Sequence, residues 1–251
     1  MTAPSLLTLR FALVSLGAML SLALASTAAA GQMAGPPQGL VSLSEPQGWF
    51  ASVAYADSDR QVHFDDMLVD IDFSRVTAAT GVNVLPFLTV RVEAGWVKAD
   101  MGITEGEGGV EWGVGARAAL WEYIIQGTPA LPRRRALRVE ADIAYHAGNS
   151  NFDEDFEWTE LTVSPLLRYT HDRTTEAVWN HRTSTGVSTY AGFQYSDWSL
   201  DYGTRTGEGN RDFGLRLGAD LRVQGGWLTQ LDAVLYDGSD RRLTIGMGYY
   251  F

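Results

Sequence analysis

The chain has 251 residues, of which 45% are hydrophobic, 11% aromatic and 20% charged, and it contains 27 glycines. This composition excludes a disordered, collagen-like or coiled-coil chain and favours an all-β protein with many turns. The absence of Cys excludes disulfide frameworks, cysteine-zinc sites and thiol nucleophiles. The net charge of −11 argues against nucleic-acid binding, which needs clustered Lys and Arg.

Residues 1–30 have the layout of a cleaved secretory signal peptide. Arg10 precedes an apolar run over 11–25, and small residues follow it. The run is shorter than the roughly 20 residues that a membrane-spanning helix needs. Residues 31–47 contain Gly and Pro breakers and show no period, so we expect a short periplasmic lead-in there. The folded domain is then predicted to be 48–251.

Within that domain the dominant pattern is alternation of apolar and polar side chains. Val90 and Val92, for example, alternate with Arg91 and Glu93. Because successive strand residues point to opposite faces, each such segment has one apolar and one polar face. Ten segments follow the pattern, at about the length that a tilted strand needs to cross a bilayer. They are 49–57, 76–84, 90–96, 110–120, 137–146, 161–169, 187–195, 212–223, 227–235 and 242–251.

The polar faces of these segments are unusually rich in charge, with cations and anions in equal number. We therefore predict a closed antiparallel up-and-down transmembrane β-barrel whose lumen is packed by Arg–carboxylate pairs. Bidentate hydrogen bonding would make this burial of charge tolerable. The predicted lumenal residues are Arg75, Arg91, Glu93, Glu111, Arg117, Arg138, Glu140, Asp142, Glu160, Arg168, Asp212, Arg216, Asp220, Arg222, Asp232 and Arg242.

Aromatic residues gather at or near the ends of the predicted strands, where a membrane barrel has its interfacial girdles. These are Trp49, Trp96, Trp112, Trp121, Tyr123, Tyr145, Trp158, Tyr169, Tyr195, Trp227 and Tyr249.

The last segment alternates up to Phe251, with Tyr249 and Tyr250 before it. Behind a signal peptide, such a strand resembles the insertion signal of bacterial outer-membrane β-barrel proteins. The layout of 48–251 is similar to that of the small barrels (the OmpA transmembrane domain, OmpX, OmpW and opacity-type proteins). The resemblance implies the outer membrane as location, with its lipid and lipopolysaccharide as surroundings. It also implies that the barrel-assembly machinery recognises Tyr249 and Phe251.

An even strand number puts both ends of a barrel in the periplasm, and ten strands satisfies this condition. The connection 170–185 is long for a periplasmic turn, and eight strands is the alternative count if two of the segments merge into long strands or loops. The predicted outer loops are 58–72, 98–109, 147–157, 197–211 and 237–240.

A barrel of about ten strands is too narrow for the wide aqueous channel that 16–18 strands enclose. We therefore expect a non-enzymatic barrel with a structural, surface-interaction or envelope-integrity role. A narrow selective channel for small solutes is the alternative. A soluble periplasmic barrel or sandwich would show the same alternation.

Catalytic patterns of barrel enzymes are missing from the sequence. The omptin proteases, which this chain resembles in size class only, need an Asp–His pair at the rim, and no Asp-x-His occurs. No His is followed by Ser two residues on, as a His-activated serine on one strand face would require. Asp142 and His146 are the candidates for a rim hydrolase, a less favoured reading. We expect no cofactor.

The third outer loop carries oxygen ligands in an order that is similar to a calcium-binding EF-hand loop. However, Glu154 stands where such a loop needs Gly for its turn. A solvated acidic loop is the default interpretation, and bound Ca²⁺ remains the alternative. The oxygen ligands would come from Asn149, Asn151, Asp153, Asp155 and Glu160.

Overall fold

The structure is a computed structural model that describes residues 49–250 with internal gaps. The gaps are 65–66, 86, 103, 127–132, 152–154, 175–183, 204, 208–210, 224–226 and 238–239. The predicted signal peptide, the lead-in and Phe251 lie outside the described residues. No described helix is long and apolar enough to cross a membrane.

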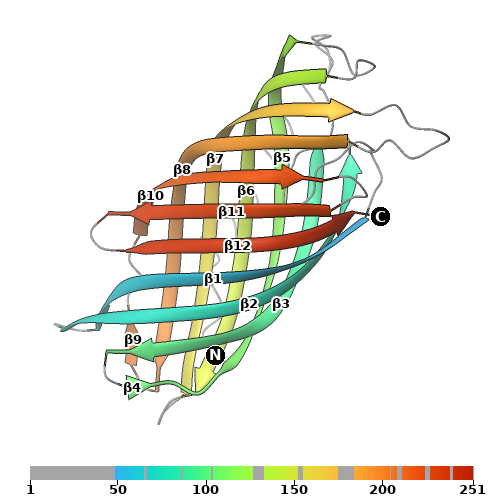
Figure 1. The fold of residues 1–251 in the computed structure, drawn as a ribbon. Helices are drawn as coiled ribbons and strands as arrows, with labels where there is room; N and C mark the ends of the chain where they lie inside the picture. The colour runs from blue at the N-terminus through green and yellow to red at the C-terminus, as the bar shows by residue number, and fades with distance from the viewer. Residues whose placement is uncertain are drawn as a thin grey trace. The chain divides into compact units, whose positions relative to one another are not determined.

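The described strands form one antiparallel sheet, in which each long strand pairs with the next long strand along the chain (Figure 1). The long strands are β1 (Trp49–Phe64), β2 (Met67–Leu85), β3 (Leu88–Met101), β5 (Gly109–Gln126), β6 (Arg133–Asn151), β7 (Asp155–Thr174), β8 (Ser184–Tyr202), β10 (Arg211–Arg222), β11 (Trp227–Tyr236) and β12 (Arg241–Tyr250). Two short strands, β4 (Thr104–Glu105) and β9 (Arg205–Gly207), extend the edges of β3 and β8.

The sheet closes on itself. The last strand, β12, pairs with β1 from Phe50↔Tyr250 to Asp59↔Arg241, and β8 pairs directly with β10. Ten long strands therefore make a complete ring, which confirms the predicted closed barrel and makes the alternative of eight strands wrong. Where neighbouring strands pair on both sides, closure satisfies their backbone hydrogen bonds within the sheet, as a membrane interior requires.

The outward face of the ring carries an apolar belt, and we call these residues the belt. Tyr55, Val76 and Trp96 mark its upper limit on β1, β2 and β3, where they are direct neighbours across the sheet and each is nearly half exposed. Its lower limit carries Trp49 and Trp227, which are also exposed. A soluble protein would bury such side chains, whereas a lipid-facing barrel presents them outward.

The polarity of the two faces reverses beyond the belt, at the end where β1–β2 and β6–β7 are joined. On β2 the outward residue changes from Val76 to Ser74 and Asp72, while the inward residue changes from Arg75 to the buried Phe73. Within the belt the strands therefore present apolar side chains outward and charged ones inward, as contact with lipid requires. Above the belt the outward face is polar and the inward face is apolar, as in a soluble protein. We call this the outer end and the opposite one the periplasmic end, following the topology that the sequence analysis expects.

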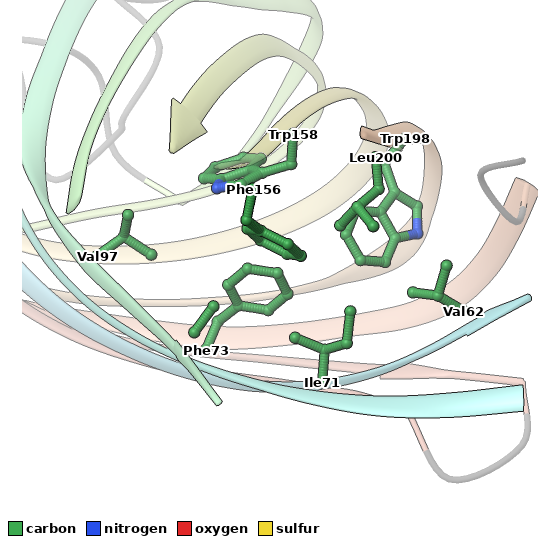
Figure 2. Close-up of a cluster of buried hydrophobic side chains, with 9 residues drawn as sticks. Val62, Ile71, Phe73, Val97, Phe156, Trp158, Trp198 and Leu200 are labelled. Atoms are coloured by element: carbon green, nitrogen blue, oxygen red, sulfur yellow. The ribbon is translucent and has the colours of Figure 1, made fainter. Parts of the chain in front are cut away.

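Apolar side chains fill the inside of the barrel at the outer end (Figure 2). Phe73 contacts three other rings, with ring centroids 5.8 to 6.2 Å apart. These inward side chains form the apolar plug, which consists of Val62, Ile71, Phe73, Val97, Ala99, Phe156, Trp158, Trp198 and Leu200.

Several expected outer loops are strands in the structure. The expected loop 58–72 is mostly a hairpin, since β1 continues to Phe64 and β2 starts at Met67. Trp158, expected in the aromatic girdle, is 1% exposed and belongs to the apolar plug. Both errors have one cause: above the belt the apolar positions change face, so the alternation that marked the strands is out of phase there.

Candidate functional site in the barrel lumen

The lumen directly below the apolar plug contains a cluster of charged side chains centred on Glu160. Arg60 donates to Glu160 at 2.8 Å and to Asp212 at 3.1 Å, and Ser196 also donates to Glu160. The Arg60 guanidinium lies 3.7 Å from the centroid of the Tyr236 ring. Arg60 was missed by sequence reasoning because it falls in the segment that was expected to be a loop.

Arg75 joins this charged cluster to the plug. Its guanidinium lies 4.5 Å from the centroid of the Trp158 ring, and it reaches Glu111 and Glu160 at 3.8 Å each. Arg242 approaches Glu160 from another strand at 4.0 Å and donates to Gln194 at 2.9 Å. At separations of 3.8 to 4.0 Å these charged groups attract one another electrostatically without forming direct hydrogen bonds.

Asp142 lies at the centre of the middle layer, where three guanidinium groups surround it. The nearest nitrogens of Arg91, Arg117 and Arg216 lie 2.8, 2.5 and 3.3 Å from its oxygens. These residues come from β3, β5, β6 and β10, so one carboxylate ties four strands together across the lumen. The carboxylate is buried and paired with three guanidinium groups, which is the condition under which a buried ion is tolerated.

The layer nearest the periplasmic end has a second set of buried pairs. Arg168 donates to Glu140 at 3.0 Å and to Asp220, and its guanidinium lies 4.4 Å from the Tyr190 ring centroid. The Tyr190 hydroxyl donates to Asp232 at 2.7 Å. This layer is braced by both ion pairs and an aromatic ring.

The sixteen residues predicted for the lumen all occupy inward-facing positions, and each is buried or half-buried. Arg138 pairs with Glu122, which the sequence reasoning missed. The cause is a β-bulge between Ala119 and Trp121, which shifts the alternation by one residue in β5. The bulge keeps Trp121 on the outward face and turns Glu122 inward. Tyr249 packs on Trp227, with ring centroids 5.1 Å apart.

In the structure, the two residues of the hydrolase hypothesis contact other charged groups. Asp142 is occupied by its three arginines, and His146 Nε2 lies 3.5 Å from Glu93 instead. Two ligands of the hypothetical calcium loop, Glu160 and Asn149, also have other partners. Glu160 is bound by Arg60 inside the lumen, and Asn149 accepts from the backbone N–H of Val110.

Asp153 and Glu154 of that loop lie outside the described residues. Among the residues that the structure does describe, no group of three or more His, Asp or Glu side chains could hold a metal ion.

A polar cavity of about 150 Å³ remains between the layers. Small side chains of β1 and β2, such as Ser52, Ala54 and Thr77, line one wall, and charged side chains such as Glu111 and Arg91 line the other. The cavity is large enough for several water molecules.

At the outer rim, carboxylates on neighbouring strands lie opposite one another. Asp59 and Asp100 flank Asp72 in the register of β1, β2 and β3. Partial burial, followed by the charges of the nearby aspartates, raises the pKa of Asp72 above its ordinary value. The rim is therefore a surface of concentrated negative charge.

No protein-family model matches the chain, and no curated protein does. Similar solved structures include the translocator domain of the autotransporter NalP from Neisseria meningitidis, at 10% identity and a TM-score of 0.36, covering 81% of this chain and 88% of that one. The outer membrane protease OmpT from Escherichia coli matches at 9% identity and a TM-score of 0.37, covering 85% and 100%. An outer membrane channel from Pseudomonas putida F1 matches at 12% identity and 0.35, covering 86% and 99%.

These likenesses transfer no function to this chain. The environment follows from its own two faces: a closed ring presents a belt of exposed apolar side chains outward and keeps its paired charges inside. The protein is a closed ten-stranded antiparallel β-barrel with the apolar outer belt of a membrane-spanning barrel.

Proposed function

We propose that this protein is a non-conducting, non-enzymatic barrel that anchors an extended β-structure on the cell surface, with a structural or surface-interaction role. The observation that carries the proposal is the closure of the lumen at the outer end. There Phe73 and Trp158 are surrounded by six other plug side chains, each with a solvent exposure of 0 or 1%. A solute that entered from outside would have to displace this core.

The ion pairs beneath the plug support the same conclusion. Asp142 and Arg168 each bridge partners from other strands, so that crosslinks cross the lumen instead of lining a free bore. The part that is free to meet a partner is the outer surface above the belt, where Asp57, Asp59 and Asp72 point outward. This surface suits contacts with other envelope or surface components.

Assembly of the barrel forms part of the proposal. The C-terminal strand β12 closes the ring on β1, and Tyr249 stands outward at its lower end. Such a strand is suited to recognition by the barrel-assembly machinery, with Tyr249 and Phe251 as the recognised residues. Outer-membrane lipid and lipopolysaccharide would then surround the belt.

A narrow channel for small solutes is the second candidate, and the polar cavity of about 150 Å³ below the plug favours it. The two candidates differ in planar lipid bilayers. The refolded barrel should give no discrete conductance steps at high protein load, with a known porin inserted afterwards as the positive control. Reproducible single-channel steps from the unaltered protein would contradict our proposal and favour the channel.

A further inference from the structure

A groove of about 770 Å³ crosses the lipid-facing surface over β12, β1, β2, β3 and β5. Its floor consists of small outward side chains, those of Ala51, Ala78, Thr80 and Ala94. The Thr80 hydroxyl donates to the Phe50 carbonyl at 2.8 Å, so this hydrogen bond is satisfied within the protein. The floor therefore offers mainly apolar contact.

Larger apolar side chains line the two ends of the groove. Tyr249, Ala51, Thr80 and Val92 are successive neighbours across four strands, so the groove follows a row of the sheet. Met247, Tyr249 and Trp227 line one end of this row, and Val92, Val114 and Trp112 line the other.

Aromatic pairs stand at both ends of this groove. Trp227 and Tyr249 pack edge-to-face at the lower limit of the belt, with ring centroids 5.1 Å apart. Trp112 packs on Tyr145 at the opposite end, with ring centroids 5.8 Å apart. Such rings prefer the interface between hydrocarbon and water. The groove therefore runs obliquely through the depth of the hydrocarbon layer.

The belt is short where the groove crosses the pairing of β12 with β1 that closes the barrel. On β12 the outward apolar side chains begin at Leu243, directly above which stands the exposed Arg241. On β5 they extend from Val110 to Ile125. A bilayer must thin or reorder its chains beside a short apolar surface, which favours a chain held along the protein.

We propose that this groove binds an acyl chain of a phospholipid from the periplasmic leaflet, with the head group beside Trp227 and Tyr249. Hydrocarbon is the matching occupant because the groove is continuous with the belt and its exposed lining is apolar. Charge decides the leaflet. Above the groove, Asp72 lies between Asp59 and Asp100, which pair with Arg241 and Lys98. The three carboxylates outnumber these two cations, so this part of the rim repels the phosphates of lipopolysaccharide.

The test compares lipids that remain bound after gentle detergent extraction of the barrel from outer membranes, measured by native mass spectrometry. Ala78→Phe and Ala94→Phe each fill the floor of the groove. Ala191→Phe makes the same change at an exposed outward position of β8, outside the groove, and is the matched control. Migration of unboiled and boiled samples on gels verifies that each variant has folded.

We expect the unaltered barrel and Ala191→Phe to retain phospholipid, and both groove variants to retain roughly tenfold less, because the apolar contact area is lost. Adding phosphatidylethanolamine to delipidated protein should restore binding only in the first two. Equal retention in all four proteins would overturn the proposal. So would retention of lipopolysaccharide instead, or a dimer that the groove variants dissociate while bound phospholipid stays unchanged.

Discussion

The ring of Tyr190 on β8 lies against the backbone of Gly218 on β10, its direct neighbour across the sheet. A Cβ added at Gly218 would lie 2.2 Å from Tyr190 Cζ. Since the ring is fixed by its hydroxyl contacts with Asp232 and Gln230, it cannot turn aside freely. Because Gly218 has no side chain, it leaves the space that the Tyr190 ring occupies.

Gly218→Ala should destabilise the barrel by about 1–3 kcal/mol, the usual effect of overpacking. Urea unfolding in lipid vesicles, followed by tryptophan fluorescence, measures it. In the double variant with Tyr190→Ala, the alanine at 218 should add little further loss, because the ring that it clashes with is gone. Additive effects of the two changes would show that the contact is unimportant.

Asp142→Asn should destabilise the protein by about 3–5 kcal/mol, because it leaves three buried guanidinium groups short of a carboxylate. Asp59→Asn breaks the exposed pair with Arg241 and should have an effect below about 1 kcal/mol. The midpoint of urea unfolding in vesicles compares the two. Similar midpoints for both variants would argue that the lumen is well hydrated around Asp142.

Leu217→Arg places a cation in the middle of the belt and should cost about 2–4 kcal/mol of stability in vesicles. Ser199→Arg adds the same side chain at an exposed position of β8 above the belt, and we expect almost no change there. If the two variants were equally stable, Leu217 would not be facing hydrocarbon.

Mild acid should tighten the outer hairpin of β1 and β2. Burial first, and then the charges of Asp59 and its neighbours, raises the pKa of Asp72, so the folded chain takes up a proton at a pH where the unfolded chain does not. Stability of the rim therefore increases as the pH falls from neutral towards about 4, the ordinary range of Asp. Below that range both states are protonated and no further gain follows.

Amide hydrogen exchange of β1 and β2, corrected for intrinsic rates, measures this effect. Asp72→Asn should raise protection at neutral pH and weaken its pH dependence, since the repelling charge is already removed. Protection that declines on acidification between neutral pH and about pH 4 would contradict the prediction.

Removal of plug side chains should open the lumen. Phe73→Ala combined with Trp198→Ala deletes two rings that contact each other, with centroids 5.8 Å apart. The variant should show conductance steps in planar bilayers, while Trp112→Ala, which deletes an outward ring, should remain silent. If the double variant folds, as verified by gel migration, but gives no conductance steps, then the ion pairs and not the plug close the lumen.

Period-two alternation predicted the strands, and the charged polar faces, the aromatic residues near the strand ends and the final alternating strand favoured a closed barrel over a soluble sheet. The inward positions of Arg168 and Glu140 follow from the same count. It could not locate Arg60 or the plug residue Trp158, since the apolar positions change face above the belt. Partner choice was also beyond the sequence: Asp142 meets arginines that are 25 to 74 residues away along the chain.

The reversal of polarity between Val76 and Ser74 fixes the height at which the cylinder sits. If the barrel moved by one residue row towards the periplasm, Asp57 would enter the hydrocarbon layer. If it moved by one row outward, Tyr55 would enter water. Vertical drift is thus penalised in both directions. The outer hairpins are therefore held at a fixed height above the membrane surface.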